Sequence, residues 1–217
     1  MTAACVYCLQ NKKLRDDQIL LRGDDLYLCA PRGQLVEGYL AIAPYECIGS
    51  LSRLPETFFP ELKRLQNIVL RFYAKSYGVT QATIFYEQGR AGADASVDAV
   101  GGFPLHAHLC SLPLAVDLHS VLAMKFFRKS VSDLAELPFV ACDEPYVYVE
   151  NAGKAAIYVA RSSEDRSQLA GMRLKPLIAN LLGYPERGYW RTYPGILELR
   201  KLKQNWRLYG EVDEYGS

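Results

Sequence analysis

The feature that most constrains this chain is the run LHAHLC at residues 105–110, which holds two of the three histidines among 217 residues. The histidines and the cysteine are spaced at the period of a β-strand, in which successive side chains alternate between the faces of a sheet. His106, His108 and Cys110 would therefore share one face, each about 6.6 Å from the next, because a strand rises ~3.3 Å per residue. Two imidazoles and a thiol suit metal ligation or nucleophilic and acid–base chemistry near pH 7. We expect both from this strand.

The first half of the chain predicts strands around one long helix. Apolar residues recur at the helical period from Thr57 to Tyr77, and Gly78 provides the glycine that commonly ends a helix. A Gly-Asp turn at residues 23–25, between two β-prone runs, indicates a hairpin. Small and turn-forming residues predict a loop over 89–102. The predicted strands are 18–22, 26–29, 38–44, 80–87 and 105–110.

The second half predicts two helices and a strand pair. The helices are expected at about 118–127 and 168–182, the latter ending at Gly183, and the strands at 146–150 and 155–160. Strands, then a helix, then strands is an order typical of an α+β protein with an antiparallel sheet.

Composition narrows the class of protein and its location. Lys and Arg number 25 against 24 acidic residues, so net charge predicts neither a nucleic acid partner nor an acidic membrane surface. No apolar run approaches the ~18–20 residues that span a bilayer, and the first residues lack the regions of a secretory signal. We therefore expect a cytoplasmic protein without membrane contact. In that reducing compartment its six cysteines should be thiols, metal ligands or packing residues.

Cys5 and Cys8 form a CxxC pair, which suits a tetrahedral zinc site if two more ligands arrive from elsewhere. Two packed thiols or a redox pair are the alternatives. Among the remaining candidates, Cys29 and Cys142 lie in apolar runs that predict buried packing. His119, at the start of a helix, is expected to be exposed or capping. The candidates that follow strand ends or lie in the histidine strand are Cys47, His106, His108 and Cys110.

The order of these motifs resembles the histidine triad (HIT) superfamily over about residues 5–113. The resemblance rests on CxxC, a strand ending in PYEC at 44–47, the long helix, YEQG at 86–89, and Gly-Gly-x-x-x-His-x-His-x-Cys-x-x-Pro. It implies a HIT-like α+β fold in which a long helix packs on an antiparallel sheet. Residues 1–115 would be the catalytic core, and residues 116–217 an α/β C-terminal extension that packs on it. The resemblance also implies a homodimer.

In zinc-bearing members of the superfamily, and in the related galactose-1-phosphate uridylyltransferases, the CxxC pair, a residue just after the proline-containing strand end and the first motif histidine hold the metal. Family members usually have His at the third of these positions, where this chain has Cys, a conservative exchange for zinc. The resemblance thus implies a structural Zn²⁺ held by Cys5, Cys8, Cys47 and His106.

The resemblance also implies an enzyme. In the family the middle histidine attacks the α-phosphorus of a nucleotide and forms a covalent nucleotidyl-histidine, and His108 holds that position here. The expected function is a nucleotidyl hydrolase or transferase that cleaves a nucleotide ester, anhydride or phosphoramidate. Its partner would be a nucleotide or a nucleotidylated small molecule. The alternative is that His108 is a core histidine with satisfied hydrogen bonds.

Two positions depart from the family pattern. The third motif position is normally His or Gln, which donates to phosphate, whereas Cys110 is a weak donor. The run before the motif also lacks the family's polar side chains. Phosphate would then rely on the N–H groups of Gly101 and Gly102, on Gln88, or on Arg173 or Arg191.

Three hypotheses stay open. Cys110 tunes the reaction of an enzyme, or the chain binds nucleotides without turnover, or it is an RNA-associated protein. The third hypothesis draws on a looser resemblance of the stretch from Met172 to Arg191 to the C-terminal extension of HIT-like proteins, and on an excess of basic residues between 187 and 207. That excess is also typical of a solvated face or a dimer surface. A pathway-specific enzyme with a changed reaction is a further alternative.

Overall fold

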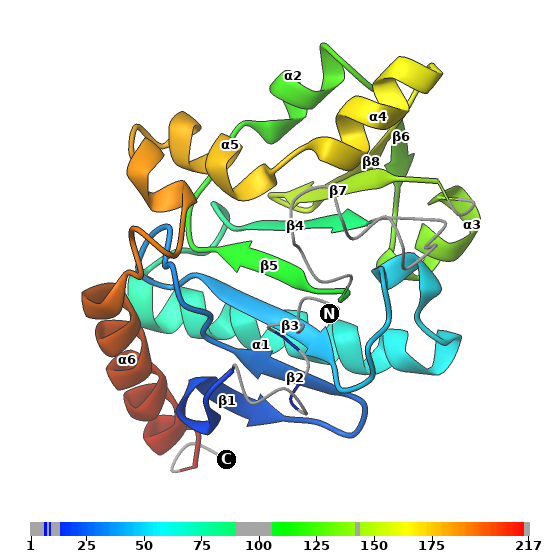
Figure 1. Ribbon diagram of the computed structural model, residues 1–217. Helices are drawn as coiled ribbons and strands as arrows, with labels where there is room; N and C mark the ends of the chain where they lie inside the picture. Colours follow the sequence, from blue (N-terminus) through cyan, green and yellow to red (C-terminus); the bar gives the residue numbers. More distant parts are fainter. Residues whose placement is uncertain (1–6, 8, 10–13, 90–105, 142–143, 215–217) are drawn as a thin grey trace.

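The computed structural model describes residues 7, 9, 14–89, 106–141 and 144–214, with side chains up to residue 210. Eight strands in these ranges form one antiparallel sheet in the order β1-β2-β3-β5-β4-β7-β8-β6 (Figure 1). The predicted α+β class is therefore confirmed. The strands are β1 (Ile19–Arg22), β2 (Leu26–Cys29), β3 (Leu40–Pro44), β4 (Ile84–Gly89), β5 (Leu109–Leu112), β6 (Phe127–Val131), β7 (Tyr146–Asn151) and β8 (Lys154–Val159).

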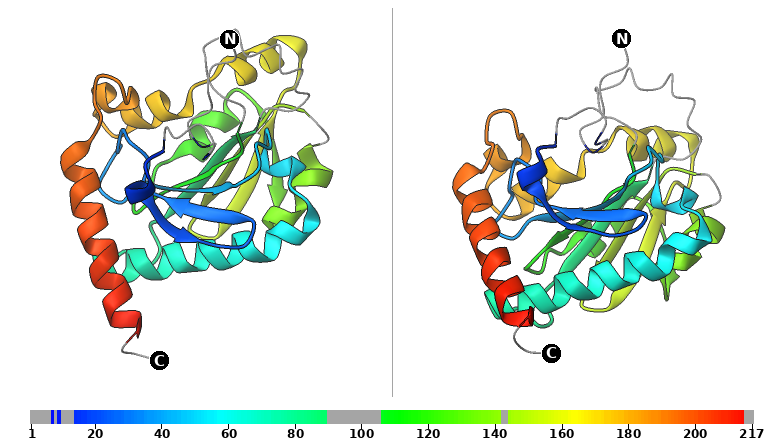
Figure 2. Two further views of the ribbon diagram at one scale, coloured as in Figure 1. Left: turned by 60° about the horizontal axis from the view of Figure 1, so that its bottom comes forward. Right: turned by 90° about the horizontal axis from the view of Figure 1, so that it is seen from below.

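Helices cover both faces of this sheet (Figure 2). One hydrophobic cluster lies between the sheet and α1, α3 and α6, and the other between the sheet and α2, α4 and α5. No helix among the described residues is long and apolar enough to cross a membrane. The α-helices are α1 (Phe59–Tyr77), α2 (Leu118–Ala123), α3 (Leu137–Ala141), α4 (Ser163–Gly171), α5 (Leu174–Leu181) and α6 (Ile196–Glu214). Short 3-10 helices are η2 (Asp16–Gln18), η3 (Leu51–Arg53), η4 (Glu56–Phe58), η6 (Leu134–Glu136) and η7 (Pro185–Gly188).

The long helix forms as the sequence predicts. Its apolar stripe, which includes Leu62, Val69 and Phe72, is fully buried against the sheet. Gly78 ends it in the left-handed conformation, with φ of 67°, and its N–H bonds to the carbonyl of Ala74. This conformation favours glycine because a Cβ would crowd the backbone.

The histidine strand is shorter than predicted. β5 begins at Leu109, where it pairs with Ile42 of β3, so His106 and His108 lie just ahead of the strand. The register of the pair would place His108 opposite Ala43 of β3, but the ladder ends one residue earlier. Ala107 nevertheless bonds through its N–H to the carbonyl of Ile48 at 2.6 Å. The motif therefore passes beside the segment that follows β3.

Several boundaries in the second half also differ. The helix predicted over 118–127 ends at Ala123, and Phe127 instead begins the edge strand β6. The helix predicted over 168–182 is two helices, α4 and α5, that meet at residues 172–173. The strand predicted over 80–87 is β4 at 84–89, and α6 was not predicted.

The region after residue 115 adds three strands to the same sheet. β7 pairs with β4 over six residues, from Ile84 opposite Asn151 to Gly89 opposite Tyr146. β8 and β6 extend the sheet beyond β7. The division of the chain at residue 115 stays a prediction, and the sheet is continuous across it.

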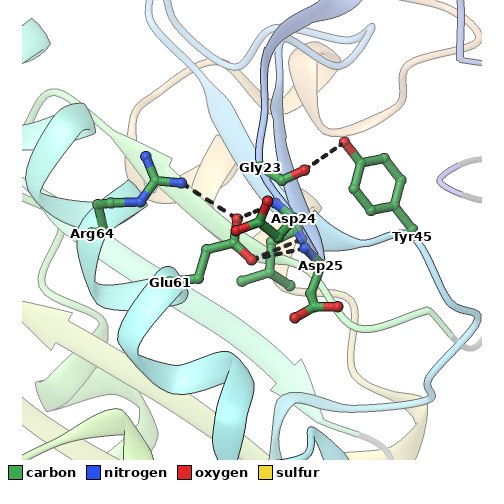
Figure 3. A network of polar contacts seen from close by, with 7 residues as sticks. Gly23, Asp24, Asp25, Tyr45, Glu61 and Arg64 are labelled. Carbon is green, nitrogen blue, oxygen red and sulfur yellow. Dashed lines mark hydrogen bonds and ion pairs between the residues drawn. The ribbon is translucent and has the colours of Figure 1, made fainter.

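A carboxylate on α1 holds the turn between β1 and β2 (Figure 3). Glu61 accepts hydrogen bonds from the N–H groups of Asp24, Asp25 and Leu26 at 2.8, 2.9 and 3.2 Å. Gly23 permits this approach, because a Cβ there would lie 1.7 Å from the carboxylate. The predicted hairpin is thereby fixed to the long helix.

We expect Glu61→Gln to destabilise the protein by about 1–3 kcal/mol, because the amide keeps only one acceptor where three N–H groups converge. Chemical denaturation would measure this loss. The matched control is Arg64→Ala, which removes only the exposed ion-pair partner of Glu61 at 3.4 Å. That change should cost less than about 1 kcal/mol. Equal stability of Glu61→Gln and the native protein would contradict the assigned role.

Candidate functional site

The candidate site lies on the central strands of the sheet. Cys110 of β5 is paired with Ala41 of β3 on one side and with Tyr86 of β4 on the other. All three belong to the cluster on the α5 side of the sheet. His106 and His108 precede β5, next to the end of β3, so the three motif residues are brought together as predicted.

His106 is buried and has one ring nitrogen without a partner. Its Nε2 lies 2.8 Å from the carbonyl oxygen of Pro44, while its buried Nδ1 has no hydrogen-bond partner among the described residues. Burial lowers the pKa of His106 to about 4. A carbonyl can only accept, so Nε2 carries the proton and Nδ1 presents a lone pair. A neutral imidazole in this state can bind a metal ion through Nδ1.

Cys47, the other predicted ligand in the described part of the chain, is exposed on the segment that follows β3. The next residue, Ile48, accepts the hydrogen bond from Ala107, so this segment runs beside His106. Cys5 and Cys8 lie outside the described residues. Within the described ranges, no three Cys, His, Asp or Glu side chains gather as a metal site.

Tyr7, which lies between the two cysteines of the CxxC pair in sequence, contacts both histidines. Its ring stacks on His108 with centroids 4.4 Å apart, and its centroid lies 6.2 Å from that of His106. The hydroxyl of Tyr27 donates to the carbonyl of Tyr7 at 2.5 Å. This residue of the N-terminal segment is therefore anchored over the motif.

His108 is oriented by the backbone. Its Nδ1 lies 2.8 Å from the carbonyl oxygen of His106, which fixes the ring and leaves Nε2 as the second functional nitrogen. Burial alone would lower the pKa of His108, but the neighbouring Cys110 sulfur raises it to about 9. Burial would raise the pKa of Cys110, but His108, Tyr39 and Tyr86 together oppose burial and lower that pKa.

Tyr39 and Lys175 complete the surroundings of Cys110. The Tyr39 hydroxyl lies 3.0 Å from the Cys110 sulfur, and the Lys175 ammonium lies 5.1 Å from the centroid of the Tyr39 ring. Lys175 also donates to the carbonyl of Arg32 at 3.5 Å, and it forms no ion pair with any described residue. Burial lowers the pKa of Lys175 to about 8, while Cys110 opposes that shift. The site therefore contains a half-buried cation.

The predicted phosphate-binding side chains lie elsewhere or outside the described residues. The Gln88 amide donates to the carbonyls of Leu169 and Met172 at 3.1 and 2.7 Å, so it caps the end of α4. Arg173 is exposed at the N-cap of α5, and exposed Arg191 lies 5.5 Å from the ring of its neighbour Trp190. Gly101 and Gly102 lie outside the described residues.

The remaining sequence candidates have structural roles. Cys29 is fully buried, as expected, and burial raises its pKa. His119 is half-buried instead of exposed, and its Nδ1 lies 2.7 Å from the Tyr158 hydroxyl. Cys142 lies outside the described residues.

Sequence reasoning missed two charged residues, Lys175 and Glu87. A single helix over 168–182 does not predict that Lys175 lies near the sheet. In the structure α5 begins at Leu174, and the Lys175 ammonium lies over the Tyr39 ring. In the sequence, Glu87 is marked only by its place in the YEQG run at 86–89. The signal that could have found it is a carboxylate within a strand whose other residues are mostly buried.

Glu87 is buried and fully hydrogen-bonded. Its two oxygens accept from the N–H of Leu51 at 2.7 Å and from the Tyr146 hydroxyl at 2.5 Å. The same hydroxyl accepts from the N–H of Ser52 at 3.0 Å. Burial raises the pKa of Glu87 to about 7 even though these bonds oppose the shift. Glu87 therefore anchors η3 to β4 and β7. Ionisation of this buried carboxyl lowers the stability of the fold.

Comparisons with known proteins found a family model, a curated protein and a solved structure that resemble this chain. Residues 1–98, less than half of the chain, match the model of a family described as "protein similar to CwfJ C-terminal". Zinc finger CCCH domain-containing protein 64 of Arabidopsis thaliana is 26% identical over 198 residues, which cover 87% of this chain. The chain spans about a third of that relative's length, 32%.

A solved structure also resembles part of the chain. It is a HIT-like protein involved in cell-cycle regulation from Bartonella henselae, bound to an unknown ligand. The sequence identity is 18%, the TM-score is 0.36, and the match covers 53% of this chain and 81% of the other.

We expect Glu87→Gln to change how stability depends on pH. A carboxyl whose pKa is higher in the folded state than the ordinary 4.5 binds extra protons there, so its contribution to stability falls as pH rises from about 4.5 to 7. The variant has no such loss. Its stability relative to the native protein should therefore rise by roughly 3 kcal/mol between pH 4 and pH 8.

Denaturation at a series of pH values would measure this difference, with the exposed Glu164→Gln as the matched control. A constant difference between Glu87→Gln and the native protein over the whole range would contradict the assignment.

Proposed function

We propose that this protein is a HIT-like nucleotidyl hydrolase or transferase that acts through His108. The observation that carries the proposal is the hydrogen bond from His108 Nδ1 to the carbonyl oxygen of His106 at 2.8 Å. It fixes the ring and, in the neutral imidazole, leaves the lone pair on Nε2. The half-buried position of His108 adds a partly dehydrated environment.

In the proposed reaction, Nε2 of neutral His108 attacks the α-phosphorus of a nucleotide ester, anhydride or phosphoramidate. An N–P bond forms while the bond to the leaving group breaks, and the leaving group takes a proton from solvent. Water or another acceptor then attacks phosphorus, breaks the N–P bond and releases the imidazole. Hydrolysis thus yields a nucleoside monophosphate.

Lys175 is the residue that we propose to bind the phosphate. It is half-buried, its ammonium lies 5.1 Å from the centroid of the Tyr39 ring, and the Tyr39 hydroxyl in turn lies 3.0 Å from the Cys110 sulfur. It forms no ion pair with any described residue. A desolvated ammonium is stabilised by an anion. Lys175 would therefore replace the donor that Cys110 cannot supply.

A second candidate function is nucleotide binding without turnover. The interaction that favours it is that of Cys110 with His108, which raises the pKa of the imidazole to about 9. A protonated imidazole has no lone pair and cannot attack phosphorus, although it can bind an anion. In this alternative His108 and Lys175 would both hold phosphate.

We also propose a structural zinc ion held by Cys5, Cys8, Cys47 and His106. The donor set suits zinc, and the buried lone pair of His106 Nδ1 supports the assignment. The contacts of Tyr7 with His106 and His108 are further support, because Tyr7 lies within the CxxC pair in sequence. The zinc would tie the N-terminal segment to the end of β3.

The enzyme proposal predicts a covalent adduct. Incubation with α-³²P-labelled nucleotides and nucleoside phosphoramidates should give an acid-labile adduct or a released monophosphate, and His108→Ala should abolish both. Lys175→Met should weaken nucleotide binding about tenfold or more, because it removes the charge while the chain length is nearly kept. The control is Lys154→Met, which changes an exposed lysine on β8.

Saturable nucleotide binding with neither adduct nor product would refute the enzyme and support the second candidate. Nucleotide binding that Lys175→Met leaves unchanged would refute the phosphate role of Lys175.

The zinc proposal predicts about one zinc per chain in protein purified without added metal. Cys47→Ala should lose the zinc and lower the melting temperature, because metal binding is coupled to folding. Cys29→Ala is the matched control, since it changes a buried cysteine outside the donor set and should keep the zinc. Metal analysis and thermal denaturation would measure both. A metal-free protein whose stability is insensitive to chelators would refute the site.

A further inference from the structure

Exposed aromatic and basic side chains continue from Lys175 across the surface. A Cβ at Gly33 would meet Trp190 Cβ at 2.4 Å and Lys175 Nζ at 2.6 Å, so both side chains pack against Gly33. The N–H of Gly33 donates to the carbonyl of Pro194 at 2.7 Å, which fixes this loop to the Trp190 segment. Trp190 is 41% exposed, and the Arg191 guanidinium lies 5.5 Å from its ring.

Helix α6 begins six residues after Trp190 and presents a basic groove. The groove has a volume of about 260 Å³ and is lined by Arg200, Lys203, Gln204 and Arg207. Lys203 is paired with Asp17 at 2.8 Å, but exposed Arg200 and Arg207 form no ion pair with any described residue. These two arginines lie about 10 Å apart along the helix axis, at 1.5 Å per residue.

The charge of this region differs from that of the whole chain. Residues 184–210 contain six basic and two acidic residues, whereas the chain has a net charge of +1. One of those acids, Glu198, already faces Arg187 at 3.7 Å and accepts from the Tyr193 hydroxyl. The chain is therefore nearly neutral in net charge but has a local excess of positive charge over residues 184–210.

We propose that the nucleotide bound beside Lys175 and His108 belongs to a single-stranded polynucleotide. A neighbouring base would stack on Trp190, and further phosphates would follow Arg191, Arg200 and Arg207. This inference rests on the proposed function, whose substrate class it narrows. Proteins that hold single strands combine exposed aromatic rings with a positive groove that tracks the backbone, and the stacking does not depend on sequence.

Two observations favour a polynucleotide over a protein partner on this surface. The groove on α6 is lined by three cations and one amide, and two of the cations, Arg200 and Arg207, form no ion pair with any described residue. Trp190 is also a neighbour of the proposed phosphate site, because it and Lys175 both pack against Gly33. A long phosphate chain neutralises such a row of cations, whereas a mononucleotide would not reach it.

The test uses the full chain and a fluorescein-labelled 12-nucleotide single-stranded RNA of mixed sequence, measured by anisotropy at 50–200 mM salt, with AMP measured by calorimetry. The RNA should bind more tightly than AMP. Trp190→Ala should lower the ratio of RNA affinity to AMP affinity about tenfold. The double variant Arg200→Ala/Arg207→Ala should reduce the slope of log affinity against log salt by about 1.4, at ~0.7 per phosphate contact.

The matched control is Lys63→Ala/Arg71→Ala, which removes two exposed cations from α1 and should change neither affinity. Circular dichroism would check that each variant is folded. If Trp190→Ala is unstable, the double variant Arg200→Ala/Arg207→Ala still tests the proposal, because both arginines are exposed. RNA affinity that neither variant changes would overturn the proposal. That result is the one expected if this surface binds a protein partner instead.

Lys175-dependent AMP binding with no tighter RNA binding would also overturn the proposal, but it would leave the proposed function intact. RNA binding that Lys175→Met leaves unchanged would break the link to the His108 site. Absence of both AMP and RNA binding would overturn the proposed function together with this inference.

Discussion

The pairing of β5 between β3 and β4 is the constraint on which the site depends. It places Cys110 opposite Ala41 on one side and Tyr86 on the other, and Ala41 in turn lies opposite Cys29 of β2. Because Ala41 has a short side chain, the face beside Cys110 has room for the Tyr39 ring, whose hydroxyl contacts the sulfur. A larger residue at this position of β3 would fill that space.

The parts of the fold that the sequence predicted are those whose stabilising contacts are local. The stripe of α1 and the stop at Gly78 are both encoded within 20 residues, and the hairpin turn of β1 and β2 within three. The HIT resemblance singled out His106, His108 and Cys110 together, because they lie in one contiguous motif. These predictions needed no knowledge of the rest of the chain.

The parts that the sequence did not predict depend on distant partners. The edge strand β6 exists because it pairs with β8, whose residues lie about 30 positions later. The break between α4 and α5 is stabilised by Gln88, whose amide bonds to Leu169 and Met172 from β4. That break directs Lys175 toward Tyr39, so the cation of the site could not be identified while one continuous helix was assumed. Tertiary contacts here override local propensity.

Two polar groups of the site have no matching partner among the described residues. His106 Nδ1 is a buried lone pair for which these residues provide no donor, and half-buried Lys175 donates to the Arg32 carbonyl but forms no ion pair with any of them. Each group carries a free-energy cost to the extent that it is removed from water, because buried donors, acceptors and charges are nearly always paired. A cation removes the first cost and an anion the second.

The motif spans the distance between them, with His106 at the end of β3 and Cys110 beside Tyr39 and Lys175. His108 lies between these two ends, and its ring is held by the carbonyl of His106. A structural metal on one side and a phosphate on the other would therefore leave His108 as the residue of the motif that faces the reaction. In the proposed function the third position could then be a cysteine, because Lys175 of α5 would supply the positive charge that phosphate needs.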